Sequence, residues 1–191
     1  ALPISLNVKA MGANPIMCSV IGQDGKAEDF FDLLDQEHLS KEGIIQSKNR
    51  LTTTKFRVIG NNHHMLRVDE EITTPLLNED NDMLMERIQN IMKKHTIDVI
   101  IFQDYDKGVI TQELIREVSR LASDNAIPVA VDPKKRNFMN YLGVSLFKPN
   151  LKELKEGLNL DSISGTIDTL KSASASLHDH AGHKMIMVTL S

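Results

Sequence analysis

The stretch VDPKKRNFMNYLGVSLFKPNLKEL, residues 131–154, decides the fold class of this 191-residue chain. It contains two apolar runs, and each run ends in a polar cluster. Asp132 and Lys134 follow the first run, and Asn150 and Glu153 follow the second. Short apolar runs bounded by turn residues are typical of strands buried in a parallel sheet. The stretch therefore predicts two neighbouring strands whose carboxyl ends carry charged and amide side chains.

The same rhythm continues on both sides of this stretch, from residue 79 onwards. We expect helices at residues 81–95, 111–125, 151–158 and 164–180, and strands at residues 97–104, 127–132, 145–150 and 184–191. Strands that alternate with helices form parallel sheets with helices on both faces. The sequence thus predicts an α/β fold with a mainly parallel sheet.

The N-terminal part adds further elements and one segment of a different kind. We expect helices at residues 2–11 and 28–39 and strands at residues 14–22 and 44–47. Residues 53–71 hold two β-rich runs on either side of Gly60, Asn61 and Asn62, which favour a turn. The pattern predicts a β-hairpin within one α/β domain that covers residues 1–191. Because a two-stranded hairpin is marginally stable alone, we expect it to pack on another surface, such as a second subunit.

The composition is that of an ordinary globular protein. Hydrophobic residues make up 41% and charged residues 25%, and the formal net charge is −4. There is no basic bias that would indicate nucleic acid, and no apolar run long enough to cross a bilayer. A single cysteine excludes an internal disulfide and favours a reducing compartment. We therefore expect a cytoplasmic protein that binds neither nucleic acid nor membrane.

Three predicted strand ends carry dense polar residues that should meet at one edge of the sheet. The candidates are Asp104, Lys107, Asp132, Lys134, Asn150 and Glu153. Carboxylates with an amide suit a hydrated Mg²⁺, lysines suit phosphate oxygens, and Gly108 allows a close approach of the backbone. Each cluster alone is also explained by turn and N-cap residues. Three clusters at one edge favour a site.

Three histidines, His178, His180 and His183, form a second cluster. Histidines gather in zinc sites, but these have no i, i+4 pair. We expect a solvated helix end instead.

Several motifs, taken in order, point to a known family. They are LNVKAMGANPIMCSVIGQD, TTTKFRVIGNNHHMLRVDEE, DYDKGVIT, IPVAVDPKKRNF and KPNLKEL, and together they cover most of the chain. In this order they resemble the ribokinase-like (PfkB) carbohydrate kinases, and most of all the branch that phosphorylates heptose 7-phosphate for ADP-heptose synthesis. The resemblance implies a three-layer α/β/α fold and transfer of phosphate from ATP, with Mg²⁺, to a sugar or sugar phosphate. It also implies that the hairpin is a lid over the sugar, and that the lid pairs with that of a second subunit in a homodimer.

The resemblance also implies roles for individual residues. Asn150 and Glu153 match the motif that organises Mg²⁺ and its waters, and Asp132 and Lys134 match the strand end that flanks the phosphates. Asp104, Tyr105, Lys107 and Gly108 match the loop beside the acceptor. Arg57 and Arg67 match lid positions that reach an anionic substituent of the sugar, and residues Thr189 to Ser191 match the start of the nucleotide loop.

The sequence departs from the family pattern in four places. Pro3 stands where an asparagine holds the sugar, Ala27 stands where glycine is common, and Asp106 stands where a small residue is common. The glycine-rich turn and the aspartate that deprotonates the acceptor are not found up to Ser191. We expect that catalytic aspartate beyond Ser191, so the sequence is predicted to be a fragment or an incomplete part of the enzyme.

Two other functions stay open at this point. One is a catalytically inactive module that binds sugar phosphates or forms oligomers, because it would keep the sheet and lid without the base. The other is a PfkB kinase for another sugar, such as a fructose phosphate, or for a nucleoside. If the acceptor is neutral, the lid arginines would not contribute to affinity. A redox domain is disfavoured, because no G-x-G-x-x-G motif follows a strand.

Overall fold

The computed structural model describes residues 2–60, 63–160, 162–163 and 165–190. These residues form two compact units, which are described separately. Unit 1 consists of Ala1–His95 with Lys107–Val109, and unit 2 of Thr96–Asp106 with Ile110–Ser191. The single domain expected over residues 1–191 stays a prediction.

Unit 1 is built around a short parallel sheet. Strands β1 (Ser19–Gly22) and β2 (Ile44–Ser47) pair in parallel, and helices α1 (Leu2–Ala10), α2 (Gly25–Gln36) and α3 (Asn78–Lys94) belong to the same unit. The core contains Ile21, Ala27, Leu34, Leu39 and Ile44, with Leu2, Leu6, Met17, Phe30 and Phe31 packed against it. Helix α2 contributes to this core because its apolar residues recur at helical spacing. The predicted helix–strand–helix–strand order of this part is confirmed.

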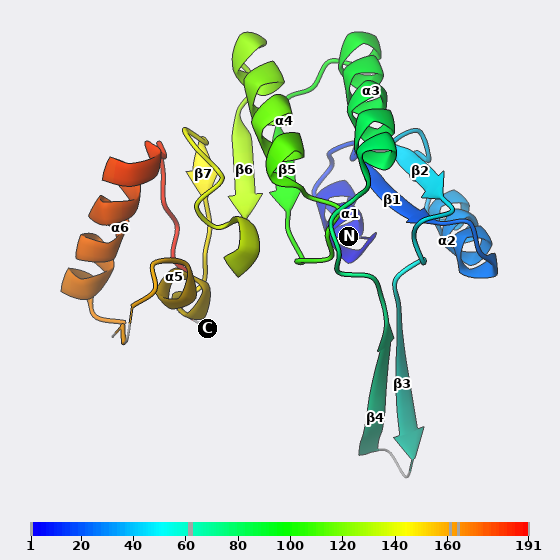
Figure 1. The fold of residues 1–191 in the computed structure, drawn as a ribbon, viewed down its shortest axis with the longest axis horizontal. Coiled ribbons are helices and arrows are strands. Elements are labelled where there is room, and N and C mark those ends of the chain that lie inside the picture. The colour runs from blue at the N-terminus through cyan, green and yellow to red at the C-terminus, as the bar shows by residue number, and fades with distance from the viewer. Residues whose placement is uncertain (1, 61–62, 161, 164, 191) are drawn as a thin grey trace. The chain divides into compact units, whose positions relative to one another are not determined.

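The predicted hairpin is present and extends away from the rest of unit 1 (Figure 1). Strands β3 (Thr54–Gly60) and β4 (His63–Glu70) pair antiparallel, with a register shift between Val58 and Ile59. This hairpin is called the lid below. The turn residues Asn61 and Asn62 lie outside the described residues.

Unit 2 contains a three-stranded parallel sheet in the order β5-β6-β7. Its elements are β5 (Ile100–Gln103), α4 (Gln112–Asp124), β6 (Val129–Asp132), the 3-10 turn η1 (Lys135–Asn137), β7 (Leu146–Phe147), α5 (Leu151–Gly157) and α6 (Ile167–Ala181). Phe102, Phe138, Tyr141 and Phe147 bring their rings together in the core, with neighbouring centroids 5.0 to 6.3 Å apart. The α/β class with parallel strands is therefore confirmed.

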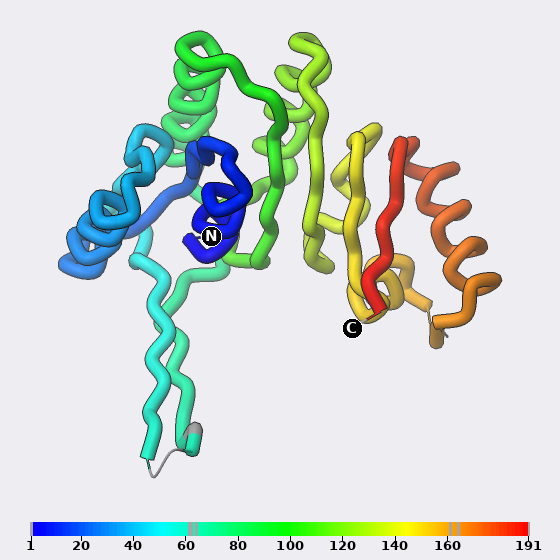
Figure 2. Tube along the Cα trace, turned by 180° about the vertical axis from the view of Figure 1, so that it is seen from behind, coloured from blue at the N-terminus to red at the C-terminus, as the bar shows by residue number. Residues whose placement is uncertain are grey.

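The last predicted strand covers residues 184–191, and its described residues, 184–190, do not form a continuous strand. Its described residues run beside β7 (Figure 2), where parallel bridges join Phe147 with Ile186 and Asn150 with Thr189, and the Met187 N–H donates to the Phe147 carbonyl at 2.9 Å. Between these bridges lies Pro149, which has no N–H to donate and so interrupts the ladder. The prediction of a continuous strand was wrong because it was made from residues 184–191 alone, without the neighbouring segment that contains Pro149.

The prediction of a solvated helix end was wrong for His183. Its side chain is 1% exposed and stacks on the ring of Phe147, with centroids 4.3 Å apart. Gly182 ends the preceding helix in a left-handed conformation, with φ of 66°, and this turn directs the chain back to the sheet. His178 and His180 remain exposed.

None of the helices that the structure describes is both long and apolar enough to cross a membrane.

Candidate functional site

The three polar strand ends of unit 2 do lie at one edge of one sheet. Strands β5, β6 and β7 are parallel neighbours, so their carboxyl ends point the same way. A direct contact joins two of the ends, because the Gln103 side chain donates to the Asp132 carboxylate over 2.6 Å. This is the edge at which open α/β sheets bind their ligands.

The centre of this edge is held together by a helix cap. Asn150 is the N-cap of α5, where its side chain accepts from the N–H of Glu153 at 2.8 Å, and the Glu153 carboxylate accepts from the N–H of Asn150 at 2.9 Å. This is a capping box, and it fixes Glu153 in a buried position with 6% exposure. The second oxygen of the same carboxylate pairs with the ammonium of Lys134. One acid thus serves both the helix and the lysine.

Lys134 and Asp132 complete what we call the strand-end cluster: Asp132, Lys134, Asn150 and Glu153. Burial lowers the pKa of Lys134, but the hydrogen bond and charge of Glu153, with the charges of Asp132 and Asp104, outweigh burial and raise it overall. Lys134 therefore stays cationic at neutral pH. The Asp132 carboxylate pairs with Lys148 over 3.0 Å.

The chemistry of the cluster fits a hydrated metal ion. Within the part of the chain that the structure describes, no three His, Cys, Asp or Glu side chains form a ligand set for a metal. Asp132 and Glu153 instead stand singly, each beside a lysine. Mg²⁺ keeps several of its waters and is commonly held by one or two carboxylates, so this donor set suits binding through water.

Asp104, predicted to lie beside the acceptor, is almost fully buried at 2% exposure. Its carboxylate accepts from the Tyr141 hydroxyl at 3.1 Å, the Asn137 amide at 3.0 Å and the N–H of Asp106 at 2.8 Å. Burial, and next the charge of Asp104, raise the pKa of the Tyr141 phenol, so that this hydroxyl remains a donor. Tyr105 beside it is 44% exposed. The buried Asp104 carboxylate therefore holds the loop in place by hydrogen bonds instead of facing the solvent.

The loop predicted to lie beside the acceptor, residues 104–108 and called the acceptor loop below, continues into unit 1 with Lys107 and Gly108. The Lys107 ammonium pairs with Glu71, just beyond the lid, over 2.5 Å. Gly108 has φ of +76°, and its carbonyl accepts from the N–H of Leu76 at 3.0 Å. The predicted loop thus touches the segment that follows β4.

The lid has two chemically different faces, because side chains alternate along its strands. Phe56 lies opposite Val68, and Val58 lies opposite Leu66. These four apolar side chains are between 45% and 57% exposed and form the apolar face of the lid.

The other face of the lid is charged. Lys55 lies opposite Asp69, and Arg57 lies opposite Arg67. Like charges directly opposite each other disfavour the hairpin, although Arg67 has a partner in Asp69 at 3.0 Å. An anion at this face would relieve the repulsion between the two arginines.

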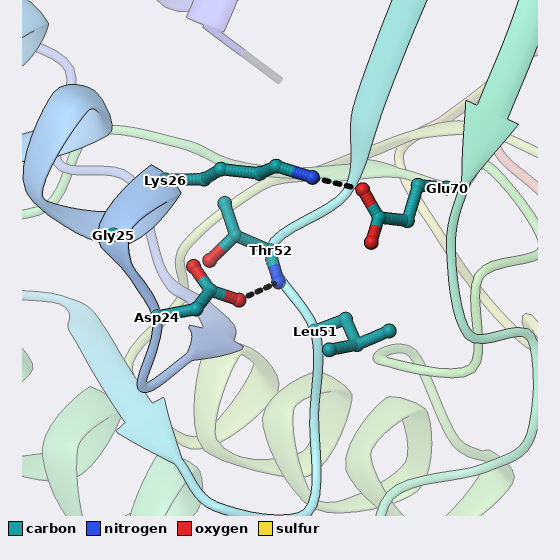
Figure 3. A pocket seen from close by; sticks show the side chains of 6 residues that line it. All are labelled: Asp24, Gly25, Lys26, Leu51, Thr52 and Glu70. Carbon is teal, nitrogen blue, oxygen red and sulfur yellow. Dashed lines mark hydrogen bonds and ion pairs between the residues drawn. The ribbon is translucent and has the colours of Figure 1, made fainter.

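A pocket at the base of the lid was not singled out from the sequence. Its volume is about 360 Å³. It is lined by Asp24, Gly25, Lys26, Leu51, Thr52 and Glu70 (Figure 3). Lys26 pairs with Glu70 of β4, and its ammonium lies 5.0 Å from the centre of the Phe56 ring. This lysine therefore connects α2 to both strands of the lid.

Asp24 lines the pocket from the N-terminus of α2. It caps α2 by accepting from the N–H of Ala27 at 3.0 Å, and it also accepts from the N–H of Thr52 at 2.8 Å. The bond from Thr52 holds the pKa of the Asp24 carboxyl below its usual value. An aspartate directly before a helix is a sequence signal for a cap, but its second bond joins residues 28 positions apart and has no local signal.

Thr189 and Ser191 are predicted to lie at the start of the nucleotide loop. Thr189 pairs with Asn150, beyond the end of β7, and its N–H donates to the Pro149 carbonyl at 3.1 Å. Ser191 lies outside the described residues.

Comparison with known proteins settles the family. Residues 3–191 match the profile of the pfkB family carbohydrate kinases. The chain belongs to this family. The family resemblance found in the motifs is therefore confirmed.

Among curated proteins, the chain is similar to the bifunctional protein HldE of several bacteria. It is 31% identical to that of Wolinella succinogenes over 191 residues, which is 100% of this chain and 40% of the relative. For Helicobacter pylori strain J99 the identity is 33% over 196 residues, with 100% and 40% covered. The chain thus spans well under half the length of these relatives.

Solved structures show the same ribokinase-like fold. Escherichia coli phosphofructokinase-2 in complex with fructose-6-phosphate aligns with a TM-score of 0.77 and 15% identity, covering 100% of this chain and 61% of that one. A 2-dehydro-3-deoxygluconokinase from Thermotoga maritima aligns with a TM-score of 0.68 and 13% identity, covering 98% and 61%. At these identities the likeness concerns the fold alone.

Proposed function

We propose that the protein phosphorylates a sugar phosphate, with heptose 7-phosphate favoured, and that ATP is the phosphate donor and Mg²⁺ the metal. The observation that carries this proposal is the strand-end cluster, in which a buried carboxylate fixed by a helix cap holds a cationic lysine at the ligand-binding edge of a parallel sheet. Membership of the carbohydrate kinase family supports the reaction class. ATP as donor makes the cytoplasm the expected compartment.

The roles in the cluster follow from charge. Phosphoryl transfer depends on positioning and on stabilising charge at the transferring group. Lys134 would donate to phosphate oxygens, because its ammonium keeps its proton. Asp132 and Glu153 would hold Mg²⁺ through its waters, and when bound this ion would neutralise charge on the phosphates. Thr189 would border the nucleotide.

The deprotonation of the acceptor hydroxyl is assigned to an aspartate of the full-length protein outside residues 1–191. General bases contribute roughly a hundredfold to ten-thousandfold to such reactions. Asp104 is an acid at the acceptor loop, but its carboxylate already accepts three hydrogen bonds. Its proposed role is to shape the loop that carries Tyr105, Lys107 and Gly108.

Unit 1 would bind the acceptor. Arg57 and Arg67 stand opposite each other on the charged lid face, where an anionic substituent would separate their charges. Lys26 and Asp24, at the base of the lid, offer a donor and an acceptor to sugar hydroxyls. These features favour a phosphorylated sugar over a neutral sugar or a nucleoside.

The apolar face of the lid suggests a homodimer. A two-stranded hairpin with one apolar face needs a cover to be stable in water. A second copy would supply an identical apolar face, and such a contact is self-complementary about a two-fold axis.

The test is to assay the full-length protein with ATP and Mg²⁺ against a panel of acceptors. The panel contains heptose 7-phosphate, fructose 6-phosphate, an unphosphorylated heptose and a nucleoside. We expect kcat/KM for a sugar phosphate to exceed that for its neutral counterpart by about tenfold or more, which corresponds to about 1.4 kcal/mol. Binding of a sugar phosphate without turnover would instead indicate the catalytically inactive module. Turnover of neutral acceptors alone would overturn the proposed substrate.

A further inference from the structure

We propose that Arg50 is a positioning residue that fixes the acceptor loop, at Lys107 and Gly108, to the segment that leaves the lid. The proposal rests on the proposed function, because it assigns the loop to acceptor binding. Arg50 precedes the lid in the chain, yet its side chain is only 8% exposed. Neither the family motifs nor the candidate site includes it.

The guanidinium of Arg50 joins two segments far apart in the sequence. One terminal nitrogen donates to the Thr74 carbonyl at 2.9 Å. The other donates to the Ile72 carbonyl at 3.2 Å and to the Lys107 carbonyl at 2.6 Å. Two of these acceptors belong to the segment after β4, and the third belongs to the acceptor loop. A planar fork with fixed donor directions is suited to holding three carbonyl groups at once.

Other contacts also join the acceptor loop to the segment after β4 and hold the two close together. The Leu76 N–H donates to the Gly108 carbonyl at 3.0 Å, and Lys107 pairs with Glu71. The α-carbon of Gly108 lies directly against the Thr74 carbonyl, so a β-carbon there would overlap with it. The absence of a β-carbon at Gly108 therefore lets the two segments pack closely. Arg50 adds hydrogen bonds to both of them.

The surroundings of Arg50 explain why the bonds must be kept. A buried cation is costly unless its donors are satisfied. Asp80, the buried acid nearby, is 3% exposed and accepts from the Ser47 hydroxyl at 2.8 Å. The two terminal nitrogens of Arg50 donate to backbone carbonyls, whereas its buried Nε has no partner among the described residues, so any movement of Thr74 or Lys107 would leave a further buried donor unpaired. This cost makes the arrangement rigid.

The link has a consequence for acceptor binding. Glu71 follows the last residue of β4, so the bonded segment continues directly from the lid. When the lid changes position, its exit segment and the acceptor loop must move together. Arg50 thereby sets the position of Lys107 and Gly108 relative to the lid.

The test compares two variants of the full-length protein, Arg50→Lys and Arg50→Met. A lysine keeps the charge but cannot reproduce the fork, so we expect both variants to lose function. The expected result is a fall of about tenfold or more in kcat/KM for the sugar phosphate, with the KM for ATP unchanged. Hydrogen exchange at the Leu76 amide, which is bonded to Gly108, should become faster in both variants.

Two controls separate positioning from simple loss of stability. Arg87→Met removes an exposed arginine of unit 1 that donates to one carbonyl, of Glu42, and should leave both readouts unchanged. Leu34→Ala removes a fully buried core side chain of the same unit and should lower the Tm without a selective change in acceptor KM or Leu76 exchange.

The proposal is overturned if Arg50→Met and Leu34→Ala change acceptor and ATP kinetics in the same proportion, or if exchange at Leu76 stays as slow as in the unaltered protein. If the unaltered protein phosphorylates none of the acceptors, the proposed function fails by itself. The exchange measurement would then still decide whether Arg50 fixes the loop.

Discussion

At the scale of single residues, His183 links burial to pH dependence. Burial, and next the charge of His178, lower the pKa of its imidazole to about 4, and neither ring nitrogen has a hydrogen-bond partner among the described residues. The folded-state pKa is below the unfolded value of about 6.5, so the unfolded chain takes up the proton more readily. The contribution of His183 to the free energy of unfolding is fully present above about pH 6.5 and falls as the pH drops towards 4. At pH 5 we expect a loss of roughly 2 kcal/mol from this residue.

Chemical denaturation at pH 8 and pH 5 measures this contribution. His183→Phe keeps an aromatic ring on Phe147 and should remove the corresponding part of the pH dependence. His180→Gln replaces an exposed histidine of the same segment and should behave like the unaltered protein. An unchanged loss between pH 8 and pH 5 in His183→Phe would show that the imidazole is not the cause.

Glu153 allows a second prediction at this scale. Glu153→Gln keeps an oxygen for the Asn150 N–H but removes the charge beside Lys134. We expect the Mg²⁺ concentration for half-maximal activity to rise by about tenfold to a hundredfold and kcat to fall. Titration of activity with Mg²⁺ in the full-length protein measures both, and Glu156→Gln, on the same helix, is the matched control. The same Mg²⁺ dependence in Glu153→Gln would contradict the assignment.

At the scale of elements, the charged face of the lid carries a prediction about selectivity. Arg57→Gln and Arg67→Gln should each weaken the binding of a sugar phosphate by about tenfold and leave that of a neutral sugar unchanged. Because the interaction is electrostatic and partly exposed, the difference should shrink at high salt. Acceptor KM values at low and high ionic strength measure it. Equal effects on both acceptors would remove the arginines from anion recognition.

Elements defined by local pattern could be predicted from the sequence. Helix α4 begins where Thr111 accepts from the Leu114 N–H, as a threonine before an apolar-periodic run predicts. The lid strands follow their alternation, and the parallel pairing of β5 with β6 follows from the intervening helix α4, whereas only the 3-10 turn η1 lies between β6 and β7. The interruption of the last predicted strand could not be inferred from its own residues, because Pro149 belongs to the neighbouring segment.

The candidate site likewise contains features that could be predicted from local sequence and features that could not. The motif residues Asp132, Lys134, Asn150 and Glu153 follow strand ends, so their meeting at one edge could be inferred from chain order. The inward direction of Asp104 depends on Tyr141 and Asn137, which lie 37 and 33 positions away. Such contacts are set by packing and leave no local pattern.

At the scale of the whole molecule, the apolar face of the lid predicts the state of assembly. Placing glutamates at Val58 and Leu66 puts charge on that face, so we expect the protein to become monomeric. Lys55→Gln, on the charged face, should leave the assembly unchanged. Analytical ultracentrifugation over a range of concentrations distinguishes the outcomes, and a monomeric unaltered protein would disprove the homodimer.

The alternation of the two lid faces also restricts changes in length. Successive side chains of a strand point to opposite sides, so inserting or deleting one residue in β3 would turn the apolar side chains to the arginine side and the arginines away from it. A change of two residues would preserve both sides. Natural variation in the length of these strands should therefore occur in steps of two, with single-residue changes confined to the turn or compensated by a bulge such as the one at Val58 and Ile59.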